Sequence, residues 1–330
     1  MLKYNMQKTQ AVSILKKIRK KRVLIIGDVM LDEYYWGTVD KISPEAPVPV
    51  VNVKQHTYSL GGASNVALNV QSLGAEPVLI GIIGDDVDGR LLKSIVRKKK
   101  IDDKGIFLEK GRPTVLKKRI IAHNQQVVRV DIEETSSIAK KTEDRIIDFF
   151  RGIDAPLCGV IIEDYNKGLL TKNLINEIVL YSRKKKLFVA VDPKFKHFFD
   201  YQGVSLFKPN LMEMGRVYGT SFSNNDDIIK AVRKLQRSIK TESVLLTMGE
   251  KGMVLVEKGK KPYYVKPHTL DVYDVSGAGD TVIAAVTLAT VSGFELREAT
   301  RFASVAAAIE VTKLGATPIT SREITGFCER

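Results

Sequence analysis

Short apolar runs, separated by longer stretches with helical periodicity, constrain the fold of this chain more than any other feature. The runs are Val23–Gly27, Val78–Gly84, Gly159–Glu163, Leu187–Asp192 and Ser243–Thr247. Nearly continuous apolar runs are typical of parallel strands that are buried on both faces. Helical patterns lie between them, at residues 63–73, 87–99, 171–183 and 226–239. This alternation predicts an α/β fold with a doubly wound, mostly parallel sheet flanked by helices.

Two segments, residues 34–60 and 112–132, interrupt the alternation without any helical pattern of their own. The first holds three prolines around a strand-like run, and the second is patterned as two β-segments. We expect both to pair as a small β-sheet lid over one edge of the main sheet. No internal repeat or low-complexity linker divides the chain. The sequence therefore predicts one domain, residues 1–330, that carries this lid.

The charge of the chain is unusual. Its 52 Lys and Arg against 38 Asp and Glu leave a net charge of +14, which favours contact with polyanions or phosphate esters. Much of the excess lies in blocks such as Lys98–Lys100 and Arg183–Lys186, where predicted helices end and their carbonyl groups favour cations. Because no aromatic platform accompanies these blocks, we expect no nucleic-acid partner. A nucleic-acid-binding module stays open as an alternative that only the net charge motivates.

The sequence also bears on compartment. The longest uncharged apolar stretch, residues 281–291, is too short to cross a bilayer. The basic N-terminal segment lacks the apolar core of a signal peptide. Two cysteines that stand far apart match neither a disulfide framework nor a zinc site. We therefore expect a soluble, cytoplasmic protein without membrane contact.

The most informative motif is Gly277-Ala278-Gly279-Asp280, directly before an apolar helical run. Glycines at a helix entrance let backbone N–H groups converge on an anion. An acidic residue beside such an anion hole repels phosphate, so its presence needs a reason. Asp280 is either a base that takes a proton from a hydroxyl during phosphoryl transfer, or an acid that complements the helix dipole. The motif alone leaves both interpretations open.

Two other places could hold a polyol. Gly61 and Gly62 precede Asn65 at the start of a predicted helix, and Asp28 and Asp32 follow the first predicted strand. Carboxylates at the carboxyl end of a parallel strand lie where α/β folds bind ligands. The alternative for the glycine pair is a tight turn before a capped helix. The Walker, dinucleotide-binding and protein-kinase motifs are absent from the sequence.

Four motifs in this order resemble the ribokinase (PfkB) family of carbohydrate and nucleoside kinases, over roughly residues 20–320. They are Gly61-Gly62-Ala63-Ser64-Asn65, Asn210-x-x-Glu213, Thr247-x-Gly249-x-x-Gly252 and Asp274-x-x-Gly277-Ala278-Gly279-Asp280. The resemblance implies a ribokinase-like fold and a phosphotransferase that uses ATP and Mg²⁺ to phosphorylate a sugar hydroxyl. A monovalent cation near the anion hole stays open.

The resemblance also implies roles for single residues. Asp280 would be the base, beside an anion hole formed by Gly277, Ala278 and Gly279. We expect the phosphorylated sugar at Asp28, Asp32, Gly61, Gly62, Asn65, Arg119, Arg129, Asp164 and Lys167. We expect ATP at Lys194, Asn210, Glu213, Thr247, Gly249, Gly252, Gly277 and Gly279, with Mg²⁺ held through water by Asn210 and Glu213. Asp164 is equally suited to form a turn at a strand end, and the basic lid residues are equally suited to be exposed strand charges.

Several further motifs are similar to one branch of the family, the kinases that phosphorylate D-glycero-D-manno-heptose 7-phosphate at O1 for ADP-heptose and lipopolysaccharide core synthesis. They are GDVMLDEYYWG at 27–37, ISPEAPVPVV at 42–51, NQQVVRVD at 124–131, EDYNKG at 163–168, DPK at 192–194 and KLGAT at 313–317. Many such proteins continue into a nucleotidyltransferase domain with an HxGH motif, which this sequence lacks. We therefore expect a separate adenylyltransferase to act downstream, and the resemblance implies a homodimer that pairs through the lid.

Two other functions stay open at this point. The chain is equally compatible with another sugar, sugar-phosphate or nucleoside kinase of the same fold, because pocket side chains choose the acceptor. A catalytically silent sugar-binding regulator is the more distant alternative, against which the intact Asp280 argues.

Overall fold

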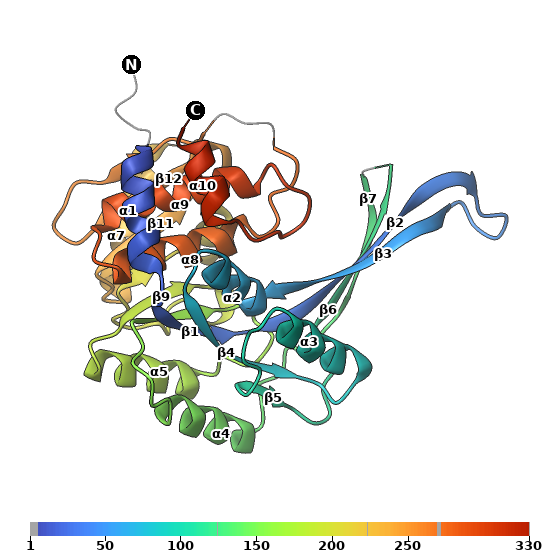
Figure 1. The fold of residues 1–330 in the computed structure, drawn as a ribbon, viewed down its shortest axis with the longest axis horizontal. Coiled ribbons are helices and arrows are strands. Elements are labelled where there is room, and N and C mark those ends of the chain that lie inside the picture. Colours follow the sequence, from blue (N-terminus) through green and yellow to red (C-terminus); the bar gives the residue numbers. More distant parts are fainter. Residues whose placement is uncertain (1–5, 124, 223, 269–271, 330) are drawn as a thin grey trace.

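The computed structural model describes residues 6–123, 125–222, 224–268 and 272–329. Within these ranges, a large sheet with helices on both faces forms the body, and a small sheet projects from it (Figure 1). Residue 124, in the second predicted lid segment, and both ends of the predicted domain lie outside the described residues.

The large sheet confirms the predicted parallel core. Across the described residues its order is β13-β12-β11-β10-β9-β8-β1-β4-β5. Neighbours run parallel except at β12, which is antiparallel to both β11 and β13. The strands are β1 (Arg22–Gly27), β4 (Glu76–Ile83), β5 (Ile106–Leu108), β8 (Gly159–Glu163), β9 (Phe188–Asp192), β10 (Leu206–Phe207), β11 (Ser243–Thr247), β12 (Met253–Glu257) and β13 (Tyr263–Val265). All five predicted runs are strands, and β5, β10, β12 and β13 are additions.

The predicted helices are also present, with ends shifted by at most one residue where the sequence predicts bounds. They are α2 (Ala63–Ser72), α3 (Val87–Lys98), α5 (Lys172–Lys184), α7 (Asn225–Ser238) and α8 (Ala278–Val291). Further helices are α1 (Lys8–Ile18), α4 (Lys140–Arg151), α6 (Leu211–Tyr218), α9 (Leu296–Glu310) and α10 (Ser321–Phe327). Basic residues fill the last turns of α1, α3 and α5, where the helix dipole favours them.

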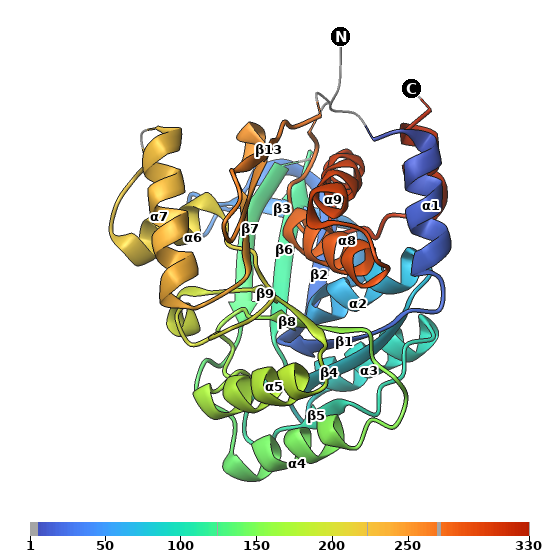
Figure 2. The same cartoon turned by 90° about the vertical axis from the view of Figure 1, so that its left-hand side faces the viewer.

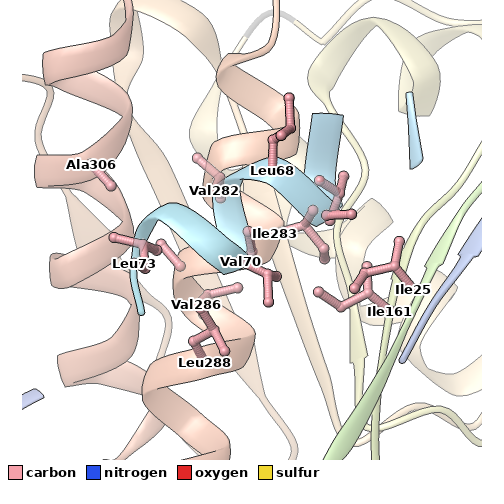
Figure 3. Packing of buried hydrophobic residues seen from close by; sticks show 14 of the residues in the cluster. Ile25, Leu68, Val70, Leu73, Ile161, Val282, Ile283, Val286, Leu288 and Ala306 are labelled. Atoms are coloured by element: carbon pink, nitrogen blue, oxygen red, sulfur yellow. The ribbon is translucent and has the colours of Figure 1, made fainter. Parts of the chain in front are cut away.

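Two apolar cores, one on each face of the sheet, explain why the strand sequences are almost continuously apolar. Along β1, Val23 and Ile25 pack with α2, α8 and α9, whereas Leu24 and Ile26 pack with α4, α5 and α7. Successive strand residues point to opposite faces, so a strand covered on both sides needs apolar residues at every position. Figure 3 shows the first core, where Val70 of α2 and Ile283 of α8 lie near Ile25.

The two helix-free segments pair in one small sheet, as the sequence predicts. Its order is β3-β2-β6-β7, and its strands are β2 (Val29–Ile42), β3 (Pro49–Gly62), β6 (Leu116–Ala122) and β7 (Gln125–Ile132). β2 and β3 are longer than expected, because β2 begins soon after β1 and β3 runs directly into α2. The lid therefore starts at the edge of the large sheet and extends away from the body (Figures 1 and 2).

None of the helices in the described ranges combines the length and the apolarity that crossing a bilayer requires.

Candidate active site

The carboxyl ends of five neighbouring strands bring polar residues together at one edge of the large sheet. Asp28 follows β1, and Glu163 and Asp192 are the last residues of β8 and β9. Lys208 follows β10, and Thr247 ends β11. In parallel α/β sheets the ligand lies outside these strand ends. The topology therefore places the candidate site here, between the large sheet and the lid.

The motif at Gly277 forms the entrance of α8. Gly277 has a φ of 86°, and α8 begins at the next residue. A Cβ at this position would stand 2.5 Å from Oε1 of Glu310 and 3.2 Å from Nδ2 of Asn65. Glycine is therefore required both by the left-handed backbone and by the lack of space. The N–H groups of Gly279 and Asp280 in the first turn of α8 are suited to bind an anion, whereas the N–H of Ala278 donates to the carbonyl oxygen of Val275 at 3.3 Å.

Asp274 fixes the loop that leads into this entrance. Its Oδ1 accepts the backbone N–H of Ser276 at 2.9 Å, and its Oδ2 accepts that of Gly315 at 3.0 Å. The carboxylate thus ties the motif to the segment that follows α9. This tie holds the anion hole in one conformation before any ligand binds, which reduces the cost of reorganisation during a reaction.

Asp280 lies in the first turn of α8 with 4% of its surface exposed. Its Oδ2 accepts a hydrogen bond from Nδ2 of Asn65 at 2.7 Å, and its Oδ1 accepts one from the hydroxyl of Tyr165 at 3.1 Å. The pKa of Asp280 is raised to about 6 in total. Burial is the largest cause of the rise, the hydrogen bond from Asn65 lowers the pKa, and the negative charge of Asp192 raises it. A carboxylate with this pKa is ionised at neutral pH and still able to take a proton, which suits a general base.

Glu163, Asp192 and Asp280 form a buried acidic cluster whose ligand oxygens all lie within 4.8 Å of one another. Nζ of Lys208 stands 2.7 Å from Oδ2 of Asp192 and brings a buried positive charge to the cluster. Burial, and then the charges of Asp192 and Asp280, raise the pKa of Glu163 well above its usual range. Buried carboxylates this close need such a cation or a bound proton.

Two adjacent cavities lie on the side of the predicted ATP residues. One of ≈ 850 Å³ is lined by Asn210, Leu211, Met212, Gly215, Arg216, Gly219, Thr220, Ser221, Phe222, Thr247, Met248 and Gly249. The other, of ≈ 630 Å³, is lined by Glu133, Thr135, Tyr165, Asn166, Lys167, Lys194, Phe195, Lys196, Asn210, Met212, Glu213 and Arg216. They share Asn210, Met212 and Arg216, so together they offer a continuous surface. Gly252 lines neither, and its φ of 81° serves the turn between β11 and β12.

Asn210 and Glu213 form a capping box at the start of α6. Oδ1 of Asn210 accepts the N–H of Glu213 at 2.8 Å, and Oε2 of Glu213 accepts the N–H of Asn210 at 2.9 Å. Oε1 of Glu213 stands 2.5 Å from Nζ of Lys194. These bonds occupy the oxygens that a directly bound Mg²⁺ would need. The residues therefore fit the predicted contact through water, at the rim of a cavity with nearby cations.

Asp32, Gly61 and Arg119 come together where the lid leaves the body. Asp32 of β2 forms an ion pair with Arg119 of β6, and both are largely buried. A Cβ at Gly61 of β3 would collide with Oδ2 of Asp32. Gly61 is thus needed to make room for this carboxylate. The sequence-predicted group of Asp32, Gly61, Gly62 and Asn65 is brought together, because β3 leads directly into α2.

Asp28 and Asp164, which we expect to bind sugar, accept hydrogen bonds from other residues of the protein. Oδ2 of Asp28 accepts the backbone N–H groups of Tyr165 at 2.8 Å and Lys167 at 3.0 Å. Asp164 accepts the N–H of Asn166 at 2.8 Å and the hydroxyl of Tyr201 at 2.6 Å. Both carboxylates are buried and hold the loop after β8. For Asp164 the structure agrees with the alternative of a turn former at a strand end.

The basic residues expected near the acceptor are all held in ion pairs. Arg129 bonds Asp131 at 2.9 and 3.0 Å, and Nζ of Lys167 stands 2.6 Å from Glu133. Arg129 lies directly opposite Arg119 in the lid sheet, so both side chains share the face that carries Asp32. Lys118, another candidate, pairs with Glu33 on the opposite face.

Sequence reasoning missed Tyr165, Asp192, Lys208 and Glu310. Tyr165 and Asp192 lie within quoted motifs. Asp192 ends β9, Lys208 directly follows β10 and Tyr165 stands two residues after β8, and such a place at the end of a parallel strand is a usable signal. Glu310 is the last residue of α9 and follows an alanine-rich apolar run, and an acidic residue in such a pattern also indicates a special environment.

Comparison with known proteins agrees with this geometry. The model of the pfkB family carbohydrate kinases matches residues 20–322. The chain belongs to this family. It is therefore a phosphotransferase that acts on a sugar hydroxyl, and the enzyme class expected from the motifs is confirmed.

Curated relatives and solved structures extend the comparison. The bifunctional protein HldE of Helicobacter pylori strain J99 is 39% identical over 307 residues, covering 92% of this chain and 65% of the relative. HldE of Wolinella succinogenes is 38% identical over 314 residues, covering 95% and 66%. The chain thus spans just under two thirds of the length of these relatives.

Two solved structures show the same fold at low sequence identity. Arabidopsis thaliana ribokinase complexed with ribose and ATP has a TM-score of 0.73 and 19% identity, with 94% of this chain and 99% of that chain covered. Escherichia coli phosphofructokinase-2 in complex with fructose-6-phosphate has a TM-score of 0.74 and 17% identity, with 94% and 98% covered. The expected ribokinase-like fold is confirmed.

Glu310 gives a test of the electrostatics behind the anion hole. It is 1% exposed, and neither of its carboxylate oxygens has a hydrogen-bond partner in the described residues. The pKa of Glu310 is raised from 4.5 to about 8: burial is the largest cause, the nearby Thr281 hydroxyl lowers the pKa, and the negative charge of Asp280 raises it. The folded state therefore binds this proton more tightly than the unfolded state does, and its contribution to stability declines as the pH rises from 4.5 to about 8.

We expect Glu310→Gln, which keeps the shape but cannot ionise, to remove this decline. Near pH 5 both proteins should have similar free energies of unfolding, because Glu310 is then protonated in the folded state. By pH 8 the variant should be the more stable, and the difference should grow with each pH step between. Urea unfolding across this range measures it, and a difference that stays constant with pH would contradict the buried, unpaired carboxyl.

Proposed function

We propose that this kinase transfers the γ-phosphoryl group of ATP to O1 of D-glycero-D-manno-heptose 7-phosphate, giving heptose 1,7-bisphosphate for ADP-heptose synthesis. The observation that carries the proposal is Asp280, a buried and doubly hydrogen-bonded carboxylate at the entrance of an anion-binding helix. The acceptor is supported by the motifs similar to heptose 7-phosphate kinases and by the 39% identity to HldE.

The proposed reaction is an in-line transfer in which Asp280 takes the proton of the acceptor hydroxyl. N–H groups at the start of α8 stabilise the negative charge that spreads over the phosphoryl oxygens. Lys194 approaches the ATP phosphates from the cavity side, where Asp192 and Glu213 outweigh burial and raise its pKa, so that it stays charged. Mg²⁺, whose water ligands Asn210 and Glu213 would hold, neutralises charge on the phosphates when it binds with ATP.

The acceptor phosphate would be recognised by the charged face of the lid. Lys117, Arg119 and Arg129 lie on one face of the lid sheet together with Asp32. Lys167 stands next to this face, because it shares Glu133 with Lys117. A phosphate dianion attracts these cations away from their carboxylate partners, and arginine can bind it with two hydrogen bonds. The same lid would exclude water, which would otherwise hydrolyse ATP.

A homodimer through the lid is also part of the proposal. Val128, Val130 and Ile132 of β7 are 44%, 45% and 40% exposed. They share the lid face opposite the charged one, as does Tyr58 of β3, which is 38% exposed. An exposed apolar face on a sheet with free edges is a surface that a second copy can cover.

A survey of acceptors tests the proposed substrate. We expect heptose 7-phosphate to give the highest kcat/KM among heptose, heptose 7-phosphate, fructose 6-phosphate, ribose and adenosine, measured by ADP release with ATP and Mg²⁺. Unphosphorylated heptose should be at least about tenfold poorer, since one charge-assisted contact contributes ~1.4 kcal/mol or more. A different best acceptor would replace the heptose assignment within the same family. No ADP release with any acceptor would favour the sugar-binding regulator.

Asp280→Asn tests the proposed base. We expect kcat to fall by about 10²–10⁴-fold, the usual contribution of a positioned acid or base, while ATP affinity is unchanged. Asp226→Asn is the matched control, because Asp226 also lies in the first turn of a helix, α7, but is exposed and away from the site. If both variants retained turnover within about tenfold of the unchanged protein, Asp280 would only complement the helix dipole.

The lid face is tested with Val128→Lys/Val130→Lys. Two charges on the apolar face should prevent a second copy from covering it, so we expect a dimer to become a monomer in sedimentation velocity. Leu180→Lys is the control, because Leu180 of α5 is 52% exposed on the body and offers the same change of chemistry outside the lid. A monomeric unchanged protein, or a dimeric double variant, would refute pairing through this face.

A further inference from the structure

Tyr165 connects the two halves of the candidate site. It follows β8, and its hydroxyl donates to Oδ1 of Asp280 at 3.1 Å. Its ring lies under Nζ of Lys194, which stands 5.0 Å from the ring centroid. Tyr165 and Lys194 both line the ≈ 630 Å³ cavity. One side chain thus contacts the proposed base at its polar end and the proposed ATP-side cation with its ring.

The loop that carries Tyr165 is held unusually firmly. Oδ2 of Asp28 accepts the N–H of Tyr165 at 2.8 Å and the N–H of Lys167 at 3.0 Å. Asn166, between them, has a φ of 55°, a left-handed conformation that is uncommon for residues other than glycine. Buried carboxylates that hold the backbone in such a conformation also fix the direction of the neighbouring side chain. The side chain so fixed is that of Tyr165.

Asp280 is consequently held from two sides. Asn65 donates to its Oδ2 and Tyr165 to its Oδ1, so the plane of the carboxylate is determined before an acceptor arrives. Each carboxylate oxygen can accept a second hydrogen bond, so two positions remain, and the acceptor hydroxyl can use one of them. The other charged groups that face Asp280 are Asp192, Glu163 and Glu310, which disfavour its negative charge, and Lys208, which favours it.

We propose that Tyr165 is a positioning residue: its hydroxyl orients the carboxylate of Asp280 and keeps it ionised, and its ring places Lys194 on the ATP side. The proposal rests on Asp280 as the base of the proposed function. It separates two contributions of one side chain, because the hydroxyl faces the acceptor half of the site and the ring faces the phosphate half. Loss of the hydroxyl should therefore affect proton transfer, and loss of the ring should also affect ATP.

Tyr165→Phe and Tyr165→Leu test these two contributions. In Tyr165→Phe we expect kcat to fall about tenfold with KM for both substrates unchanged, since one hydrogen bond to a charged group is lost. The acid limb of the pH profile of kcat/KM should move up by about one pH unit, because the bond stabilises only the ionised form of Asp280. In Tyr165→Leu we expect the same shift together with a raised KM for ATP.

Tyr201→Phe is the matched control. Its hydroxyl is also buried and donates to an aspartate of the same loop, Asp164, at 2.6 Å. We expect this variant to lower the free energy of unfolding without moving the acid limb. If the acid limb of kcat/KM moved by the same amount in Tyr201→Phe and Tyr165→Phe, both tyrosines would only stabilise the loop. Unchanged kcat and an unchanged acid limb in Tyr165→Phe would overturn the proposal.

A second measurement is independent of turnover and of the acceptor. In protein labelled with ¹³C at the aspartate carboxyl groups, the Asp280 resonance is assigned by its absence in Asp280→Asn and titrated by NMR. Its midpoint should rise in Tyr165→Phe and stay in place in Tyr201→Phe. If Asp280→Asn retains turnover, the proposed base is wrong. If Asp280→Asn is inactive but the midpoint does not move in Tyr165→Phe, only the positioning role is wrong.

Discussion

Buried negative charge at the carboxyl ends of the strands is the constraint on which the rest of the site depends. Glu163, Asp192 and Asp280 lie close together, and burial there raises the pKa of both Glu163 and Asp280. The negative charge is stabilised by Lys208, which lies beside Asp192, and by two hydrogen bonds that Asn65 and Tyr165 donate to Asp280. These partners come from distant parts of the chain, so the fold of the entire sheet is needed to keep one carboxylate ionised and accessible.

The two faces of the lid sheet carry different side chains. Alternation along β2, β6 and β7 places Asp32 and Arg119 on the face toward the site and the exposed valines of β7 on the other. The first face carries charged side chains beside the site, and the second carries the exposed Val128, Val130 and Ile132 together with the Glu33–Lys118 ion pair. A shift of one residue in register would exchange the two faces.

The sequence predicted the large elements well because their patterns are local. A run such as Val23–Gly27 is apolar at every position since both faces of its strand are covered, and the motif at Gly277 is bound to a helix entrance by its own backbone. The roles of Asp28 and Asp164 were harder to predict. Their place at strand ends indicates ligand binding, and the structure shows that they also hold the loop of Tyr165; no local pattern distinguishes these two uses of a carboxylate.

By itself, then, the sequence determined the sheet, the helices around it, the helix-free lid and the anion-binding entrance of α8, because periodicity and glycine geometry act over a few residues. The motif alone left Asp280 as either a base or an acid that complements the helix dipole. Only the tertiary structure shows that Asn65, 215 positions away, and Tyr165, 115 positions away, converge on its carboxylate. Burial, like-charge repulsion and hydrogen bonding depend on distance in space, and chain folding sets that distance.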